Sequence, residues 1–573
     1  VIANPNGISV NGGTFSNTGN VALSTGRVQF NDFDIAPGVP QRNLVLTTNQ
    51  GAIEIGPAGL SGAFNSLELI AKQLRVNGPV SNTVSRADAR IRVVAGDSKA
   101  VIDTSVSPTD NLTPWIAYEG GDASSSNAVL IDITPLGSLT AGRIQIAVTD
   151  RGAGVRNAGE LYANVGDFTL SASGELRVTG GGVRATRHVD VAAAALIVEG
   201  SSERTARVHS DGGSITIQAA GAVALSAGEL AAGGDVVIHA GTFSQRNTGA
   251  MKSGTIATQG SVLIDSGGEV HNIGSLIQGN AAAANGAAVT IKSRGSIYNT
   301  SDDTAVQPAV IFSGAGDVRL EAKGDIRNNS ARVLAAENLI LSAGGAAVNA
   351  VERGGDVAGG EVQAYQKRDQ NWLGLPLRES GFSVDYGQLT GTHTEAFLKA
   401  GHDVVIEATN ITNRGGNIYA DAGDVRFGAA ARIDNIGLAT GTAQFKRKCK
   451  LLFCRARADS DVEVLGGEIS AAHDIVFAAG EEISNVGGRV LALNDMTLTA
   501  PKVSARGIVG YTSIDRSNGM KSWFGDTWAQ IYAADVGGTF TAGGGKLTIN
   551  GTAYAEGAAF SAAEGVEASG GVV

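Results

Sequence analysis

Apolar and polar residues alternate with a period of two along most of the chain, in short runs bounded by Gly, Asn and Asp. Because successive side chains of a strand point to opposite faces, Val404 and Ile406 are expected to face inward, and Asp403, Val405 and Glu407 outward. No segment has the 3.6-residue apolar stripe of an amphipathic helix. The pattern therefore predicts many short β-strands joined by tight turns.

The alternating segments recur with a period of about 21 residues. The segments from His402 (HDVVIEATNITNRGGNIYADAGDV) and from His473 (HDIVFAAGEEISNVGGRVLALNDM) share an Asp-led alternation followed by Ile-x-Asn-x-Gly-Gly. A leucine-rich repeat of similar period would need Leu-x-x-Leu-x-Leu and a helical return, and neither is found here. The repeat predicts an all-β solenoid, a parallel β-helix whose coils bury one another's apolar faces.

The Asn of each repeat has two interpretations. Asn413, Asn435 and Asn485 follow apolar residues at strand ends. Such an Asn can be a solvent-exposed turn residue that bonds the local backbone, or a member of an internal ladder of stacked amides. The sequence leaves both open.

The composition agrees with a solenoid. The chain has 573 residues with 80 Gly, 5% aromatic and 43% hydrophobic residues, so a core of Val, Ile, Leu and Ala is available and disorder is disfavoured. A net charge of −11 with no basic stripe argues against nucleic-acid binding. We expect no transmembrane segment, because no run of about 18 apolar residues occurs.

Two stretches interrupt the repeat, residues 356–400 and 505–535, and both are expected to be extra-helical insertions. They contain aromatic residues that could bind a partner: Trp372, Tyr386, Trp523 and Trp528. The alternative is that these aromatics are hydrophobic plugs folded over one side of the solenoid.

The first residues, VIANPNGISV, predict a type I turn with Asn4 at its first position, Pro5 and Asn6 at its centre and Gly7 at its end. Together with NVALSTGRV and FNSLELIAKQLRVNGPV, this opening resembles the second half of the secretion domain of two-partner-secretion exoproteins, the filamentous haemagglutinin-like family. The most specific motif residues are Asn4, Pro5, Asn6, Gly7 and Ile8. The later repeats resemble the haemagglutinin repeats of that family.

The resemblance implies a right-handed parallel β-helix. It further implies a non-enzymatic exoprotein of a Gram-negative cell, secreted or held at the cell surface, that acts as an adhesin or as the stalk of a contact-dependent growth-inhibition system. The implied partners are an outer-membrane two-partner transporter, whose periplasmic domains recognise the secretion domain, and a receptor or glycan on a host or neighbouring cell. The sequence is expected to be a fragment that begins inside the secretion domain.

The expected domain organisation follows from the motif, the repeats and their interruptions. Residues 1–100 form the C-terminal half of the secretion (haemagglutination-activity) domain, and the remaining segments are β-helical repeats over 101–355, an insertion over 356–400, repeats over 401–504 with a basic Cys loop at 445–458, an insertion over 505–535 and repeats over 536–573.

The segment FKRKCKLLFCRARADSD is the one dense basic cluster of the sequence. Its basic residues are Lys446, Arg447, Lys448, Lys450, Arg455 and Arg457, and they bracket Cys449 and Cys454. The functional interpretation is a disulfide-pinned loop that binds an anionic surface; the alternative is an ordinary solvated loop. Two Cys without a nearby Cys/His pair fall short of the four ligands of zinc, so no metal and no cofactor are expected.

A carbohydrate-active β-helix enzyme, a polysaccharide lyase or hydrolase, is the alternative function. Such enzymes carry carboxylate pairs on adjacent coils. NTSDD, from Asn299 to Asp303, resembles a polygalacturonase Asp pair only superficially, because no Gly-His-Gly partner follows. A polar turn is the favoured interpretation, and the chain is not expected to be an enzyme.

Overall fold

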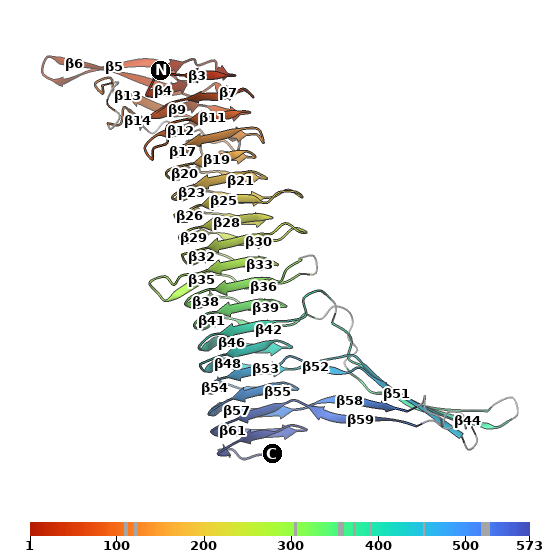
Figure 1. Cartoon of the computed structure of the whole chain (residues 1–573). Helices are drawn as coiled ribbons and strands as arrows, with labels where there is room; N and C mark the ends of the chain where they lie inside the picture. Colours follow the sequence, from red (N-terminus) through yellow and green to blue (C-terminus); the bar gives the residue numbers. More distant parts are fainter. Residues whose placement is uncertain are drawn as a thin grey trace. The chain divides into compact units, whose positions relative to one another are not determined.

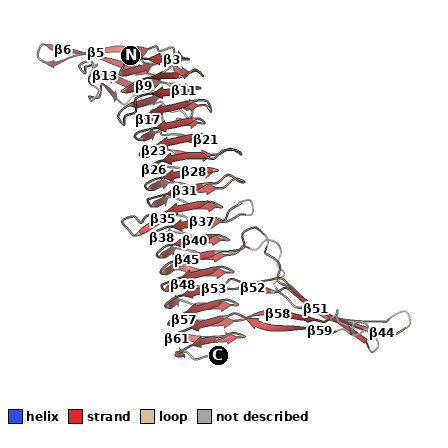
Figure 2. Ribbon diagram, viewed as in Figure 1, coloured by secondary structure: helices blue, strands red, loops and turns tan. Residues whose placement is uncertain are grey.

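The computed structural model describes residues 1–573 except 108–109, 111–112, 120–123, 303–305, 353–359, 371–373, 390, 451–452 and 517–527. All of the regular secondary structure in this described part is β-strand (Figure 2). Within it, no helix has the length and apolar character needed to cross a membrane. The chain divides into two compact units, unit 1 (Val1–Gly295 and Thr304–Gly316) and unit 2 (Ser296–Asp303 and Asp317–Val573).

Unit 1 is built from three ladders of parallel strands. Figure 1 shows the strands of successive coils stacked on one another. The first ladder comprises β1 (Ile2–Ala3), β4 (Asn20–Ser24), β9 (Ser66–Ala71), β12 (Arg90–Ala95), β17 (Arg143–Val148), β20 (Phe168–Ser171), β23 (Val189–Ala193), β26 (Ile215–Ala219), β29 (Val236–Ala240), β32 (Val262–Ser266) and β35 (Ala287–Ser293). The second comprises β2 (Ile8–Val10), β7 (Ala52–Ile55), β10 (Gln73–Val76), β15 (Val129–Ile133), β18 (Gly154–Asn157), β21 (Glu175–Thr179), β24 (Ala195–Glu199), β27 (Ala222–Ser226), β30 (Thr242–Arg246) and β33 (Val270–Ile273). The third comprises β3 (Gly13–Phe15), β8 (Leu60–Gly62), β11 (Pro79–Asn82), β16 (Ser138–Ala141), β19 (Glu160–Ala163), β22 (Gly182–Ala185), β25 (Ala206–Ser210), β28 (Gly228–Ala232), β31 (Gly254–Ala257), β34 (Leu276–Gly279) and β37 (Val310–Ser313).

Unit 2 has the same three-ladder construction, with several longer strands that take part in two ladders. The first ladder comprises β38 (Asp317–Ala322), β41 (Leu339–Ala343), β46 (Val404–Arg414), β48 (Val425–Ile436), β54 (Ile475–Ala479), β57 (Met496–Arg506), β61 (Lys546–Glu556) and β63 (Gly565–Ala568). The second comprises β36 (Ile297–Thr300), β39 (Ile326–Asn329), β42 (Ala346–Ala350), β46, β48, β55 (Glu482–Val486), β57 and β61. The third comprises β40 (Arg332–Ala335), β45 (Phe397–Ala400), β47 (Asn417–Ala420), β53 (Glu468–Ala471), β56 (Arg489–Ala492), β60 (Thr539–Ala542) and β62 (Phe560–Ala562).

The register of these ladders agrees with the repeat read from the sequence. Residues one period apart lie opposite each other on neighbouring coils, as in the pairs Ile215 and Val236, Val318 and Leu339, Val404 and Val425, and Ile475 and Met496. Val404 and Ile406 are buried, whereas Glu407 is exposed. The predicted parallel β-helix and the predicted inward positions are therefore confirmed.

The core consists of columns of apolar side chains that stack from coil to coil. Along the first ladder of unit 1, one such column contains Leu67, Ile91, Ile144, Phe168, Val189, Ile215, Val236 and Val262. No coil could bury its own apolar face alone, so each depends on the coils beside it.

The asparagines form an internal ladder in unit 2. Each side-chain Nδ2 donates a hydrogen bond to the Oδ1 of the next Asn, at 2.7 to 2.9 Å, through the series Asn299, Asn328, Asn349, Asn413, Asn435 and Asn485. These side chains are at most 2% exposed. Of the two interpretations left open by the sequence, the stacked internal amides are correct.

Accessory antiparallel sheets accompany the coils. In unit 1, β5 (Arg27–Ala36), β6 (Val39–Thr48), β13 (Ser98–Ile102) and β14 (Ile116–Glu119) form a sheet in the order β14-β13-β6-β5. In unit 2, a second sheet has the order β43-β44-β50-β51, with the strands β43 (Gln363–Gln370), β44 (Pro376–Asp385), β50 (Thr442–Lys450) and β51 (Phe453–Ser460). Two antiparallel pairs complete unit 2, β49 (Leu438–Thr440) with β52 (Glu463–Leu465), and β58 (Ile508–Asp515) with β59 (Ala529–Val536).

Candidate functional site

The opening motif forms the predicted turn. The backbone N–H of Gly7 donates to the carbonyl of Asn4 at 3.0 Å, and the Asn6 N–H donates to Oδ1 of Asn4 at 3.1 Å. Ile8 then pairs with Ile53 on the next coil. The motif is thus a hydrogen-bonded corner that leads from β1 into β2.

Gly51 lies directly against this corner. A Cβ at Gly51, whose φ is +80°, would lie 2.6 Å from the carbonyl oxygen of Pro5. We expect Gly51→Ala to cost about 3 kcal/mol of unfolding free energy, because backbone strain and a clash with rigid backbone add.

Gly38 provides the matched control for this prediction. It has a similar φ of +76° but no atom within 4 Å of its added Cβ, so Gly38→Ala should cost only about 1 kcal/mol. Urea denaturation of both variants measures the difference. Equal losses would show that the contact with Pro5 is unimportant.

The Asp that leads each repeat has a structural role. Oδ1 of Asp403 accepts the backbone N–H of Asp424 at 2.9 Å, Asp424 accepts that of Asp474 at 3.0 Å, and Asp474 accepts that of Asp495 at 3.0 Å. Each carboxylate therefore caps the start of a strand in the neighbouring coil. This use explains the recurring Asp without acid–base chemistry.

Three excursions of unit 2 that are far apart in sequence come together in one arm, made of β43, β44, β50, β51, β58 and β59 (Figure 1). Strand β44 of the first excursion pairs along its length with β50 of the second. The third excursion, β58 with β59, packs against β51, where Oγ of Ser460 donates to the carbonyl of Tyr511 at 2.7 Å. The rings of Phe382 and Tyr511 lie 5.9 Å apart.

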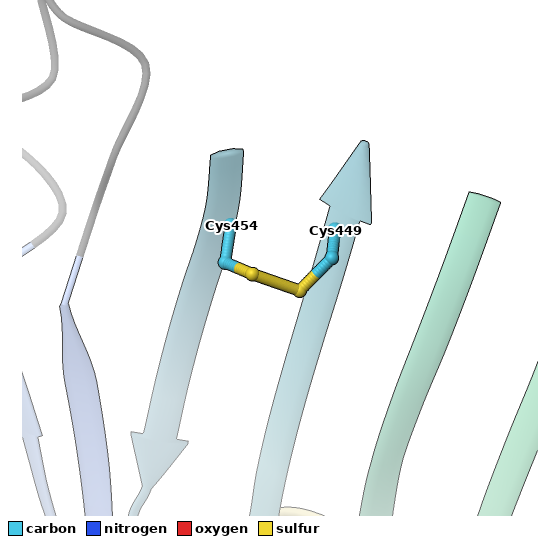
Figure 3. Close-up of a disulfide and its surroundings, with 2 residues drawn as sticks. All are labelled: Cys449 and Cys454. Atoms are coloured by element: carbon cyan, nitrogen blue, oxygen red, sulfur yellow. A yellow bond between two sulfur atoms is a disulfide. The ribbon is translucent and has the colours of Figure 1, made fainter. Parts of the chain in front are cut away.

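The segment 445–458, expected as a loop, forms most of the hairpin β50–β51 in this arm. Cys449 and Cys454 lie opposite each other on the two strands and are joined by a disulfide (Figure 3). All six predicted basic residues are exposed. Because side chains alternate along a strand, Arg447 and the two Cys lie on one face, and Lys446, Lys448, Lys450, Arg455 and Arg457 on the other.

The predicted partner-binding aromatics have different surroundings. Trp372 and Trp523 lie outside the described residues. The hydroxyl of Tyr386 donates to the carbonyl of Val509 at 2.8 Å and so links two excursions of the arm. Trp528 is exposed, with the guanidinium of Arg516 5.5 Å from its ring centroid. Tyr386 therefore helps to hold the arm together, and partner binding by Tyr386 and Trp528 stays a prediction.

No cluster suited to a metal ion is found among the described residues, taking groups of three or more His, Cys, Asp or Glu. Asn299 of the NTSDD segment belongs to the buried asparagine ladder, and Asp303 lies outside the described residues. Within the described part, the recurrent carboxylates cap strands.

The comparison with protein families bears on the N-terminal motif. Residues 1–178 match the TPS secretion domain family. The predicted resemblance to two-partner-secretion exoproteins is thereby confirmed. We refer to residues 1–178 as the TPS region; it contains the corner at Asn4–Gly7 and the sheet β14-β13-β6-β5.

Several known proteins are similar to the chain. The tRNA nuclease CdiA-2 of Burkholderia pseudomallei is 34% identical over 182 residues, which are 31% of this chain and 5% of that protein. A tRNA nuclease CdiA of Yersinia mollaretii is 30% identical over 336 residues, 58% of this chain and 10% of that protein. The filamentous hemagglutinin of Bordetella pertussis is 29% identical over 261 residues, 45% of this chain and 6% of that protein. The chain thus spans 10% or less of the length of these relatives.

Among solved structures, the crystal structure of a filamentous hemagglutinin secretion domain matches with 29% identity and a TM-score of 0.28, covering 38% of this chain and 65% of that one. The family match and the relatives support a secreted or cell-surface exoprotein of the two-partner type. They do not favour the carbohydrate-active enzyme.

The accessory sheet of the TPS region covers a side of the coils. Leu46 of β6 and Ala100 and Ile102 of β13 pack on Ile70 and Val94 of the solenoid. Strand β5 forms the outer edge of this sheet and exposes several large apolar side chains, Val28, Phe30, Phe33 and Ile35.

Two carboxylates near this sheet are buried. Glu68 is fully buried and accepts hydrogen bonds from the Tyr118 hydroxyl at 2.8 Å and from Arg90 at 3.2 Å. Burial and the neighbouring Glu68 carboxylate raise the pKa of Tyr118, so its hydroxyl remains a donor. Asp150 is also fully buried, and Nζ of Lys72 lies 2.6 Å from its Oδ2.

Sequence reasoning missed several residues that matter for these sites. Lys72, Glu68 and Asp150 are not spaced at the repeat period. The alternation in RVQFNDFDIA was the one available signal for β5. It predicts a strand but does not show which part of the molecule covers that strand.

Proposed function

We propose that this chain is the exported solenoid of a two-partner-secretion exoprotein. An outer-membrane two-partner transporter recognises the TPS region, and the solenoid holds the arm of unit 2 toward a receptor or glycan on a host or neighbouring cell. The observation that carries the proposal is the match of residues 1–178 to the TPS secretion domain family.

The architecture suits export as an unfolded chain. Successive coils pair with their sequence neighbours, so folding can proceed from one end once the chain has crossed the membrane. The chain has 2 Cys, and they bridge positions on one hairpin, so no long-range disulfide has to form.

The proposal covers both an adhesin and the stalk of a contact-dependent growth-inhibition effector. A filamentous hemagglutinin and CdiA proteins are similar to the same chain, which supports a role common to both. The nuclease activity in the CdiA names belongs to proteins of which this chain covers 10% or less, so we propose no catalysis for residues 1–573. We further propose that the chain has the domain organisation predicted from its sequence, with a secretion domain, β-helical repeats and insertions.

An export assay in cells with and without a transporter tests this function. The protein should be released, or become accessible to added protease at the cell surface, only in cells that also produce an outer-membrane two-partner transporter. A transporter lacking its periplasmic domains is the control and should leave the protein inside. Surface exposure that is independent of the transporter would contradict the proposal.

A further inference from the structure

The disulfide of the arm lies among arginines. Residues directly opposite each other in an antiparallel sheet share a face. Cys449 is opposite Cys454 on one side and Arg378 on the other, and Arg378 is opposite Arg368. Arg447 precedes Cys449 by two residues on the same strand and therefore points the same way. We refer to these five residues, Arg368, Arg378, Arg447, Cys449 and Cys454, as the cysteine face.

The charges of these arginines are not neutralised by the sheet that carries them. The four acidic residues of its strands alternate onto the other face: Asp369, Glu379, Asp385 and Asp459. Asp515 of β58 lies further in along β51, where it accepts the backbone N–H of Ala458 at 3.2 Å. In the part of the chain that the structure describes, none of the three arginines has an ion-pair partner. A cluster of cations without counter-charge attracts and stabilises an anion at its centre.

The disulfide adds little to the pairing of the hairpin. The two cysteines are separated by 5 positions in sequence, and a crosslink stabilises a fold least when the loop that it closes is short. Eight residue pairs join β50 to β51, and nine join β50 to β44. The sheet can therefore stay paired when the S–S bond opens, so a structural role does not account for this bond.

The two sulfur atoms differ in position. Cys454 belongs to β51, the last strand of the sheet, whereas Cys449 belongs to β50 between β51 and β44 (Figure 3). Both cysteines are partly exposed. The hairpin β58–β59 packs on β51 further in, where Ala529 contacts Ala456 and Ala458. In thiol–disulfide exchange the three sulfur atoms lie in a line, so a thiolate that comes from the outer side attacks Cys454 and expels Cys449.

We propose that the disulfide of the arm exchanges with small anionic thiols outside the cell. The attacking thiolate forms a bond to Sγ of Cys454, the S–S bond breaks, and its electron pair leaves on Sγ of Cys449, which becomes a thiolate. Arg378, directly opposite Cys449, stabilises the charge that develops there. A leaving thiolate that is stabilised in this way departs faster. The product is a mixed disulfide that adds the acidic groups of the thiol to the cysteine face.

Reaction of the purified chain with reduced glutathione, a thiol that carries two carboxylates, tests the proposal and requires no export. After a short reaction and an acid quench, mass spectrometry should show glutathione on Cys454 and a thiol at Cys449. The rate should fall as the salt concentration rises, whereas the rate with cysteamine, a cationic thiol, should rise. Absence of the adduct, an adduct mainly on Cys449, or the same salt dependence for both thiols would overturn the proposal.

Paired variants test the role of the arginines. Arg378→Gln with Arg447→Gln should slow the reaction with glutathione about tenfold, because the leaving thiolate loses its nearest cations. The control, Lys367→Gln with Arg457→Gln, removes the same charge from the other face of the sheet and should change the rate less than about threefold. All four side chains are exposed, so both variants should keep the wild-type melting temperature. Equal slowing in the two variants would contradict a role for the cysteine face.

Single-cysteine variants test the difference between the two sulfur atoms without any exchange partner. Only the thiolate form of a cysteine reacts with iodoacetamide. At about pH 6, the Cys449 thiol of the Cys454→Ser variant should therefore be alkylated at least about threefold faster than the Cys454 thiol of the Cys449→Ser variant. Equal rates, or a faster reaction of Cys454, would contradict the assignment of Cys449 as the leaving group.

Discussion

Replacing Asn413 by alanine is expected to lower the unfolding free energy of unit 2 by about 3 kcal/mol, because it breaks the asparagine ladder at its centre. Oδ1 of Asn413 accepts from Asn349 at 2.8 Å, and its Nδ2 donates to the carbonyl of Gly416 and to Oδ1 of Asn435, both at 2.9 Å. Alanine leaves these buried partners without a hydrogen bond and leaves a cavity that water cannot readily fill.

Asn410→Ala is the matched control for the ladder. Asn410 belongs to the same strand, β46, is only partly buried, and makes no side-chain hydrogen bond to a described residue. Its replacement should cost less than about 0.5 kcal/mol. Hydrogen exchange of the neighbouring backbone amides reports local opening of unit 2 even where the solenoid does not unfold in one step. Similar exchange rates in the two variants would show that the ladder contributes little stability.

Asn413→Asp separates the hydrogen bonds from the shape of the side chain. A carboxylate there cannot donate to Oδ1 of Asn435, and burial would raise its pKa above the ordinary value of about 3.9. A raised carboxyl pKa destabilises the fold most at high pH and less as the pH falls through that value. The variant should therefore be closer to wild-type stability at pH 4 than at pH 7.

The sequence was sufficient to predict the coils because their signal is local and repeated. Val404 and Ile406 could be placed inside from alternation alone, and the Asp of each repeat marked the register that the structure shows at Asp403 and Asp424. The same signal could not decide the position of Asn413, since an Asn after an apolar residue suits an exposed turn and a buried ladder equally well.

The arm could not be predicted from the sequence, although its parts were recognised as interruptions. Strands β44 and β50 pair although 56 residues of chain lie between Asp385 and Thr442, and such a pairing leaves no periodic trace. The basic segment was visible because its charges are contiguous. Its division between two faces depends on the strand register of the hairpin β50–β51.

Replacing Lys72 by methionine is expected to destabilise the TPS region by about 4 kcal/mol, because it leaves a buried carboxylate without its cation. Nζ of Lys72 lies 2.6 Å from Asp150 and 2.6 Å from Asp97, and the Asp150 side chain is 0% exposed. The control, Lys99→Met, removes one partner of the exposed pair of Lys99 and Glu119 and should cost less than about 1 kcal/mol. Thermal unfolding compares the two, and equal losses would show that burial of the pair is unimportant.

The pH dependence of the same cluster gives an independent test. Burial alone would raise the pKa of Asp150, but hydrogen bonds from the Asp97 backbone and from Lys72 outweigh this effect and lower the pKa below its ordinary value. A carboxylate with a lowered pKa stabilises the fold above the unfolded pKa of about 3.9, and this stabilisation is lost as the pH falls through the folded pKa. The wild-type TPS region should therefore lose stability more steeply below about pH 4 than the Asp150→Asn variant, which has no such proton to bind. Parallel acid-unfolding curves would contradict the assignment of this loss to Asp150.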